Sequence, residues 1–264
     1  MRRIGGSSIA AIMGMDEFKT SFDVWAECMG HKQEKSIPMR FGNFAEPFVE
    51  ELFKEWYLEK FGLEPSLVGK TAYEYEDWCA CHLDNLMQTH VVEYKTVSIR
   101  SAWKWTEAPP VNYAMQCQLY MHVSGIHRAF LFGLIGSESV KCYELAYDAA
   151  LAAQLVQAGS EFWRKHIQTA VTPPMDHSNG AKAVLRELYP FSSTVMRAAT
   201  DQEEVLAGEY VFLKQEFDES EKRYEAVKNK LAYNIGTAEG VRTKYGTFTY
   251  KSTKSGSRVL RFSR

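Results

Sequence analysis

The sequence has no long hydrophobic run, no Cys-x-x-Cys pair and little excess charge of either sign. No apolar stretch approaches the roughly 18 residues that a membrane-spanning helix needs. The five cysteines are odd in number, and no signal peptide precedes them, so a reducing cytoplasm is predicted rather than a secreted disulfide scaffold. We find no internal repeat or low-complexity segment. These absences exclude membrane-spanning, disulfide-rich and repeat proteins.

The formal net charge of −2 argues against a uniformly basic nucleic-acid coat, but the charge is unevenly distributed. The last 24 residues hold seven cations and no Asp or Glu, so the first 240 residues carry −9. Aromatic residues interleave with these cations, a pattern typical of nucleic-acid binding and equally of a solvated strand face. The seven are Arg242, Lys244, Lys251, Lys254, Arg258, Arg261 and Arg264.

The stretch from His82 to Thr96 contains the most informative pattern of polar residues. Two short apolar runs, 79–83 and 91–97, flank a polar turn, which predicts a β-hairpin. Successive strand residues point to opposite faces, so Glu93 and Lys95 share one face while Tyr94 points into the core. If Asp84 lies opposite them, two carboxylates and an ammonium converge on one spot.

Two neighbouring carboxylates repel each other by several kcal/mol, and a divalent cation removes that repulsion. Oxygen ligands with some retained water suit Mg²⁺, and Mn²⁺ is the alternative. Such an ion polarises a phosphoryl oxygen and lowers the pKa of bound water, while Lys95 positions or helps to deprotonate that water. The alternative interpretation is a hairpin with a surface salt bridge, because Glu-x-Lys is common on strands.

Periodicity predicts an α/β chain with a helical C-terminal region. Helices are expected from Ser7 or Ser8 as N-cap, from Thr20 or Ser21 to Gly30, and over 39–61, 111–124, 148–169 and 201–233. Strands are expected over 68–75, 78–87, 128–135 and 140–146, with a hairpin over 240–264. Apolar residues from Leu206 to Leu231 follow 4-3 spacing, with Ser220 as the one gap, which indicates a coiled-coil seam or a helix lying on another helix.

An Asp followed about ten residues later by Glu-x-Lys on a neighbouring strand is similar to the signature of the PD-(D/E)XK nucleases. Here His82-Leu83-Asp84-Asn85 stands where Ser-Pro-Asp-Gly is usual. Three further matches narrow the resemblance to the YqaJ-type viral recombinase nucleases, relatives of lambda exonuclease. They are Ile4-Gly5-Gly6-Ser7, Gly42-x-x-x-Glu46 and Tyr113-x-x-Gln116-x-Gln118. The resemblance covers roughly residues 4–170.

The resemblance implies a role for each matching residue. Asp84, Glu93, the Tyr94 carbonyl and Glu46 are expected to hold the metal. Lys95 and Gln116 are expected to orient the attacking water, with Tyr113 as a lesser candidate at the same site. Ser7 is expected to contact a terminal 5′-phosphate, with Ser8 as the fallback. The family's arginine has no matching position, so Arg2 or Arg3 is expected to replace it.

The implied fold is a PD-(D/E)XK restriction-endonuclease-like core, a mixed sheet flanked by helices, over 1–175. A C-terminal helix and β-hairpin appendage follows over 176–264. The implied function is Mg²⁺-dependent 5′→3′ degradation of linear double-stranded DNA, exposing 3′ single strands for recombination by annealing. The resemblance also implies a ring trimer, a single-strand annealing partner, and phage or prophage origin in a bacterial host cytoplasm.

Two alternatives remain open at this point. One is an endonuclease of the same superfamily, which would cut closed circular DNA. The other is a catalytically inactive DNA-binding or scaffold module, organised through the seam at 206–231.

Overall fold

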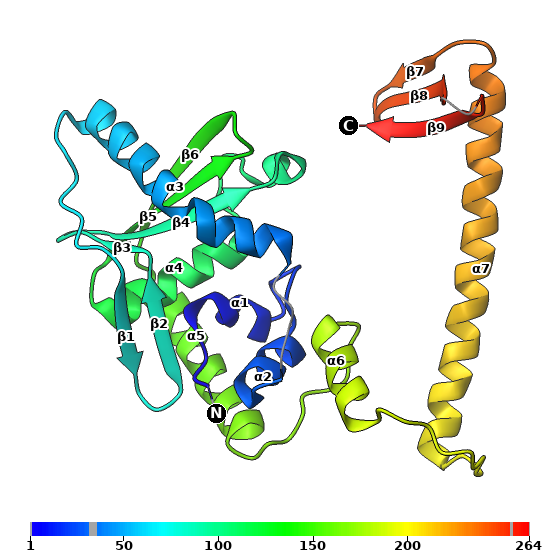
Figure 1. Cartoon of the computed structure of the whole chain (residues 1–264), viewed down its shortest axis with the longest axis horizontal. Helices are drawn as coiled ribbons and strands as arrows, with labels where there is room; N and C mark the ends of the chain where they lie inside the picture. The colour runs from blue at the N-terminus through cyan, green and yellow to red at the C-terminus, as the bar shows by residue number, and fades with distance from the viewer. Residues whose placement is uncertain (1, 32–35, 254–255, 264) are drawn as a thin grey trace. The chain divides into compact units, whose positions relative to one another are not determined.

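The computed structural model describes residues 2–31, 36–253 and 256–263. The chain divides into two compact units, Met1–Ser192 and Ser193–Arg264 (Figure 1). The helical segments of the first unit are η1 (Gly6–Ser8), α1 (Ile9–Ile12), α2 (Ser21–Met29), α3 (Ile37–Phe61), η2 (Ile99–Lys104), α4 (Val111–Ser124), α5 (Ala149–Phe162), η3 (Trp163–Ile167) and α6 (Asn179–Leu188). Its strands are β1 (Thr71–Tyr75), β2 (Cys79–Leu83), β3 (Asn85–Leu86), β4 (Val91–Val97), β5 (Arg128–Ile135) and β6 (Ser139–Ala146).

The central sheet of the first unit has the strand order β3-β4-β5-β6. Strands β4 and β5 are parallel and the other two pairs are antiparallel, so the sheet is mixed. Parallel neighbours need a long crossover, and the segment between β4 and β5 supplies it with η2 and α4. The predicted mixed sheet flanked by helices is therefore confirmed.

Each face of this sheet is covered by helices (Figure 1). On one face, Val92 and Tyr94 of β4 pack with Phe53 of α3, whose ring centroid lies 5.7 Å from that of Tyr94. On the other face, Val91 of β4 joins the larger core with Leu119 of α4. The alternation of β4 side chains thus places Tyr94 in the α3 core, as predicted, and turns the odd-numbered residues toward α4.

The predicted pairing of 79–83 with 91–97 is wrong. Strand β2 pairs with β1, and the strand that pairs with β4 is the two-residue β3, with Asn85 opposite Val92. The segment predicted as a polar turn therefore contains a strand of its own. Asp84 lies between β2 and β3, where the chain passes from one sheet to the other, and the next position of the antiparallel register is Glu93.

Side-chain hydrogen bonds cap the starts of α2 and α3 but not that of α1. Thr20 accepts a hydrogen bond from the Asp23 backbone in a capping box, and Ser36 caps α3, which continues through Pro47. Ser8 occupies the N-cap position of α1, as predicted, but its side chain makes no capping hydrogen bond to the helix. Ser8 is buried and its hydroxyl accepts from Lys19 Nζ instead, at 3.0 Å.

The first unit extends to Ser192 because α6 packs on α2. The Gly180 amide donates to Asp23 Oδ1 at 2.7 Å, and Ala181 and Val184 are buried. The division at residue 175 remains a prediction about which parts of the chain fold and act separately.

The second unit contains one long helix, α7 (Asp201–Ile235), and strands β7 (Gly240–Thr243), β8 (Gly246–Ser252) and β9 (Arg258–Ser263). The predicted hairpin over 240–264 is wrong in strand number, because the three strands form one antiparallel sheet. Lys254 and Arg264 lie outside the described residues. Among the described residues, no helix is both long and apolar enough to cross a membrane.

Candidate active site

Glu93 and Lys95 share the face of β4 that is turned toward α4. Glu93 is 2% exposed, and the Lys95 side chain is 19% exposed. Lys95 Nζ lies 2.5 Å from Glu93 Oε1, so the ammonium and the carboxylate form a charge-assisted hydrogen bond away from bulk water. The Lys95 ammonium also lies 4.9 Å from the centroid of the Tyr113 ring.

Asp84 joins this pair through the backbone of β4. Its Oδ2 accepts a hydrogen bond from the Tyr94 amide at 2.9 Å, which fixes the carboxylate beside the Glu93-Tyr94-Lys95 segment. Burial and the negative charge of Glu93 raise the pKa of Asp84 to about 8, and the nearby Lys95 ammonium only partly offsets them. The cluster therefore lacks positive charge, and a cation is the partner that would restore the carboxylate form.

Gln116 of α4 links the helix to these charges. Its amide nitrogen donates to Glu93 Oε1 at 2.6 Å and to the Tyr120 hydroxyl at 2.9 Å, while its oxygen accepts from Lys95 Nζ at 3.2 Å. Gln118, only two residues later, does not contact these charges: it donates to Ala146 O and accepts from the Asp148 amide. The structure thus brings together Asp84, Glu93, Lys95 and Gln116, the sequence-predicted residues of three separate elements.

The charges around Lys95 decide its protonation state. Burial by itself lowers the pKa of Lys95, but the Glu93 and Asp84 charges outweigh burial and raise it above its ordinary value. Lys95 is therefore an ammonium at neutral pH. In this state it can donate hydrogen bonds to a water or to a phosphate oxygen, but it cannot accept a proton.

Glu46 lies on α3, on the opposite side of β4. Gly42, one helical turn earlier, allows α3 to approach β4 closely, because a Cβ at this position would lie 3.2 Å from Thr96 Oγ1. Glu46 forms an ion pair with Lys70 at 2.7 Å and adds to the negative potential at Asp84. Over residues 2–31, 36–253 and 256–263, no three His, Cys, Asp or Glu side chains are close enough together to hold a metal ion.

One observation on the donor set favours a cation at this site. Glu93 Oε2 is buried and has no hydrogen-bond partner among the described residues, an arrangement that costs free energy unless another group binds that oxygen. Burial and the Glu93 charge also raise the pKa of Asp84, so these two carboxylates supply oxygen ligands of the kind that a hard divalent ion prefers. Glu46 would complete such a site only after leaving Lys70.

The N-terminal segment that carries the predicted phosphate-binding residues is joined to β2 and α4. Ile4 forms a parallel bridge with Cys79, and a Cβ on Gly6 would overlap the Tyr120 ring, so this glycine permits close packing against α4. Ser7 and Arg2 are exposed. Arg3 forms an ion pair with Glu74 at 2.7 Å, so it would have to leave Glu74 to bind a phosphate.

Three residues that were not predicted as site residues contact the predicted ones or their neighbours. Lys19 bonds both Ser8 and Glu27, Tyr120 accepts a hydrogen bond from Gln116, and Glu50 accepts one from Asn85 Nδ2 at 3.1 Å. For Tyr120 a signal existed, because it is one helical turn after Gln116 and therefore on the same face. The contacts of Lys19 and Glu50 cross between elements and had no local signal.

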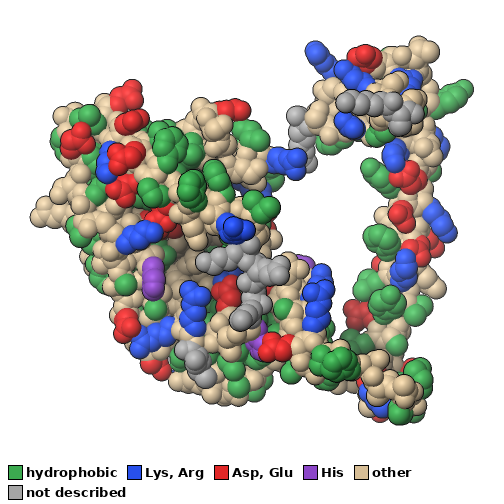
Figure 2. Space-filling model, viewed as in Figure 1, with side chains coloured by type: hydrophobic (Ala, Val, Ile, Leu, Met, Phe, Trp, Pro, Cys, Tyr) green, Lys and Arg blue, Asp and Glu red, His purple; other side chains and the backbone are tan. Residues whose placement is uncertain are grey.

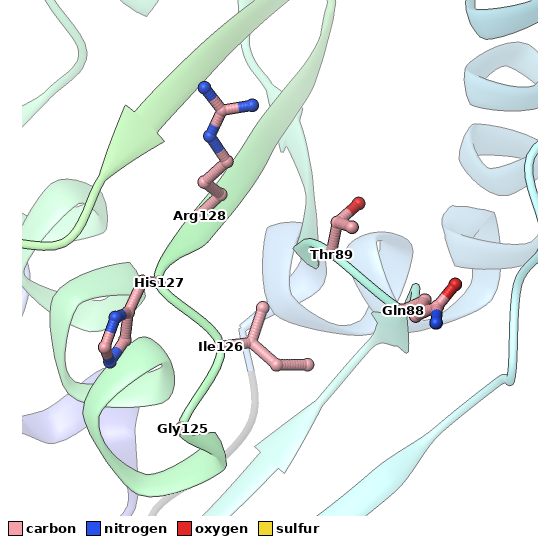
Figure 3. Close-up of a pocket in the computed structure, with 6 residues that line it drawn as sticks. All are labelled: Gln88, Thr89, Gly125, Ile126, His127 and Arg128. Carbon is pink, nitrogen blue, oxygen red and sulfur yellow. The ribbon is translucent and has the colours of Figure 1, made fainter.

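A shallow pocket on the first unit lies away from these residues (Figure 3). It lies between the loop before β4 and the loop that joins α4 to β5, and none of its lining residues is a predicted site residue. The lining residues are Gln88, Thr89, Gly125, Ile126, His127 and Arg128. Because it contains no carboxylate, it lacks the residues that the sequence predicts for the active site. Those residues are Asp84, Glu93, Lys95 and Gln116, which we call the β4–α4 cluster.

A mixed sheet flanked by helices, with Glu-x-Lys on a central strand and an Asp at the adjoining strand, defines a PD-(D/E)XK-type fold. Comparison with solved structures agrees with this class. The complex of the alkaline exonuclease LHK-Exo, from Laribacter hongkongensis, with dAMP is similar over 70% of this chain and 93% of that chain, with 17% identity and a TM-score of 0.50.

Residues 1–127 match the YqaJ-like viral recombinase domain, so the resemblance inferred from the motifs is confirmed. The chain is also 24% identical to the uncharacterized protein YqaJ of Bacillus subtilis over 247 residues, which is 89% of this chain and 76% of that protein.

Proposed function

We propose that the protein is a divalent-metal-dependent exodeoxyribonuclease that degrades linear double-stranded DNA in the 5′→3′ direction. The observation that carries this proposal is the convergence of Asp84, Glu93, Lys95 and Gln116, with one buried Glu93 oxygen that has no partner in the described part of the chain. The similarity to the alkaline exonuclease supports the same conclusion at the level of the fold.

Asp84, Glu93 and the Tyr94 carbonyl would hold the metal, which we take to be Mg²⁺ or Mn²⁺, with Glu46 as a further ligand. When bound, a divalent ion polarises the scissile phosphate and lowers the pKa of the attacking water. Glu93 stays hydrogen-bonded to Gln116, so its orientation does not depend on the metal alone.

The residues on the α4 side would act on the water and the phosphate. The Lys95 ammonium stabilises the negative charge that grows on the phosphate oxygens, and the Gln116 oxygen accepts a hydrogen bond that orients the attacking water. Hydrolysis adds one water across the phosphorus–oxygen bond and leaves a phosphate on one product and a hydroxyl on the other. In the metal-free protein the Glu93 charge raises the pKa of Lys95, so we assign Lys95 to positioning and charge stabilisation.

The 5′ direction requires a site for the terminal phosphate. We place it at Ser7, which is exposed on η1 beside the packed Gly6–Tyr120 contact that leads to Gln116. Ser8 is the weaker candidate, because its hydroxyl is buried and already accepts from Lys19. Arg2 is the better placed arginine, because Arg3 is paired with Glu74. Products with 3′ single strands would suit an annealing protein.

Digestion of linear duplex DNA labelled at either the 5′ or the 3′ end tests this proposal. With Mg²⁺ we expect early release of the 5′ label as mononucleotide, late release of the 3′ label, faster initiation on 5′-phosphorylated ends, and no reaction in EDTA. Closed circular DNA of the same sequence is the matched control and should remain intact.

Three outcomes would contradict the proposal in different ways. Cutting of the closed circle would make the protein an endonuclease. Early release of the 3′ label would reverse the direction. No metal-dependent degradation under any condition would leave a DNA-binding or scaffold module.

A further inference from the structure

The long helix of the second unit exposes a continuous apolar seam. Six of its seam residues are between 52% and 71% exposed, although each is a large hydrophobic side chain. Exposed apolar rows of this length mark surfaces that bind another molecule. Figure 2 shows hydrophobic side chains among acidic and basic ones along α7. The six are Leu206, Tyr210, Leu213, Phe217, Tyr224 and Val227, and Leu231 continues the row.

The 4-3 spacing of this seam assigns heptad positions to the whole helix. Leu206 takes position d and Tyr210 takes position a, which makes the residues at e and g the flanks of the seam. Charges at e and g decide which partner helix is accepted and in which direction. The e residues are Ala207, Lys214, Glu221 and Lys228, and the g residues are Glu209, Glu216, Arg223 and Lys230.

A parallel pair of α7 helices in register is electrostatically unfavourable. In a parallel coiled coil each g residue faces the e residue of the next heptad on the partner. Glu209 would face a lysine, but Glu216 would face the partner's Glu221 and Arg223 would face the partner's Lys228. Two of the three contacts on each side therefore repel.

An antiparallel pair reverses this result. In antiparallel coiled coils g residues face g residues and e residues face e residues. With the two seams overlapping along their full length, every charged flank residue that faces another charge faces one of opposite sign. These contacts are Glu209 with the partner's Lys230, Glu216 with the partner's Arg223, and Lys214 with the partner's Glu221.

The register is also specified by these charges. A shift of one heptad in one direction places Glu216 against the partner's Glu216 and Lys214 against the partner's Lys214. The opposite shift places Arg223 against the partner's Arg223. The full-length register has the further advantage that Phe217 lies opposite the partner's Ser220, so an aromatic ring faces the one small polar residue of the seam.

We propose that α7 binds α7 of a second copy of this chain as an antiparallel two-helix coiled coil centred between Phe217 and Ser220. The occupant is a second copy because the charge pattern of α7 complements itself in this direction and register. The interaction is independent of nuclease chemistry, since it uses no residue of the β4–α4 cluster.

Charge reversal on the full-length protein tests the proposal, with sedimentation velocity over a range of concentrations as the measurement. Glu216→Arg places two arginines together in the antiparallel pair, so we expect the dissociation constant to rise about tenfold. In a parallel pair the same change creates an attractive contact with the partner's Glu221 and would tighten association. The double variant E216R/R223E restores the antiparallel pairing and should restore the wild-type constant.

Crosslinking tests the direction separately. We expect a mixture of the Leu206→Cys and Leu231→Cys variants to form the 206–231 disulfide on oxidation, and neither variant alone to crosslink through its new cysteine. Far-UV circular dichroism confirms that each variant keeps its helix. A monomeric wild type, an association constant that does not respond to E216R, tighter association of E216R, or a 206–206 disulfide would each overturn the proposal. If copies of the chain associated through the first unit, the association constant would not respond to E216R.

Discussion

At the scale of single residues, Lys95 makes several of the contacts that define the candidate active site. Its ammonium is held by Glu93 and Gln116 and faces the Tyr113 ring, so its removal changes the charge and the hydrogen bonding of the site. We expect Lys95→Ala to bind linear DNA with wild-type affinity and to lose cleavage by about 10² to 10⁴-fold. Binding is measured by fluorescence anisotropy and cleavage by release of the 5′ label. Undiminished cleavage would remove Lys95 from the chemistry.

A matched pair of variants distinguishes a catalytic role of Gln116 from a purely structural one. Gln116→Ala removes the hydrogen bonds to Glu93 and Lys95, and we expect kcat to fall by about 10 to 100-fold. Gln118→Ala removes bonds to Ala146 and Asp148, so it should lower Tm and leave kcat unchanged. Steady-state kinetics and thermal unfolding of both variants make the comparison. Equal kcat losses would show that Gln116 has only a structural role.

The raised pKa of Asp84 predicts a pH dependence of stability in the metal-free protein. Between its ordinary value of 3.8 and about 8, the folded state binds more protons at this group than the unfolded state does. Stability therefore falls as pH rises through this window, by up to about 1.4 kcal/mol per pH unit. Asp84→Asn keeps a hydrogen-bond acceptor and removes the ionisation of the side chain that causes this loss of stability.

Urea unfolding in EDTA from pH 4 to pH 8.5 measures the effect. We expect Asp84→Asn to gain stability over wild type progressively as pH rises. Asp218→Asn, an exposed change on α7, is the control and should give a curve parallel to that of wild type. A parallel curve for Asp84→Asn would show that burial of Asp84 does not strain the fold.

At the scale of elements, two glycines in helices differ in what surrounds them. A Cβ on Gly159 of α5 would lie 2.3 Å from the ring of Trp78, which is completely buried, whereas a Cβ on Gly208 of α7 meets nothing within 4 Å. We expect Gly159→Ala to destabilise the first unit by about 1 to 3 kcal/mol. We expect Gly208→Ala to stabilise α7 by about 1 kcal/mol, because alanine is the better helix former.

The positions of the tryptophans allow both effects to be measured in one chain. All six tryptophans belong to the first unit, so their fluorescence reports its unfolding, while far-UV circular dichroism also includes α7. Gly159→Ala should lower the urea midpoint of the fluorescence transition, and Gly208→Ala should leave that midpoint unchanged. A shift of the fluorescence midpoint by Gly208→Ala would show that the two units unfold together.

At the scale of the whole molecule, the basic C-terminal sheet contains two kinds of cation. Arg258 donates to the carbonyls of Tyr250, Gly236 and Ala238, and Lys251 pairs with Glu239 at 3.0 Å, so these two hold the second unit together. Arg242, Lys244 and Arg261 are exposed. These three exposed cations are therefore the ones in the C-terminal sheet that are available to contact phosphate groups.

Removal of two exposed cations should change the salt dependence of DNA binding. In the Lys95→Ala background, which prevents cleavage, we expect Arg242→Ala with Arg261→Ala to reduce the slope of log K against log salt by about 1 to 2. Lys222→Ala removes an exposed cation from α7 and is the control. An unchanged slope in the double variant would exclude this sheet from the DNA interface.

The sequence by itself determined several of the helices and strands and the polar face of β4. Periods of 2 and 3.6 predicted α4 and β5 with the bounds that the structure has, because hydrophobic patterning is a local property. The alternation along β4 likewise placed Glu93 and Lys95 on one face and Tyr94 on the other.

Only the tertiary structure decided how separate segments meet. The partner of β4 is β3 rather than β2, and the Ser8 hydroxyl, at the N-cap of α1, accepts from Lys19 and makes no capping hydrogen bond. Pairing and hydrogen bonding across segments follow packing that no local pattern encodes. The fold also set the protonation of Asp84 and Lys95, since each pKa depends on burial and on charges that distant parts of the chain bring close.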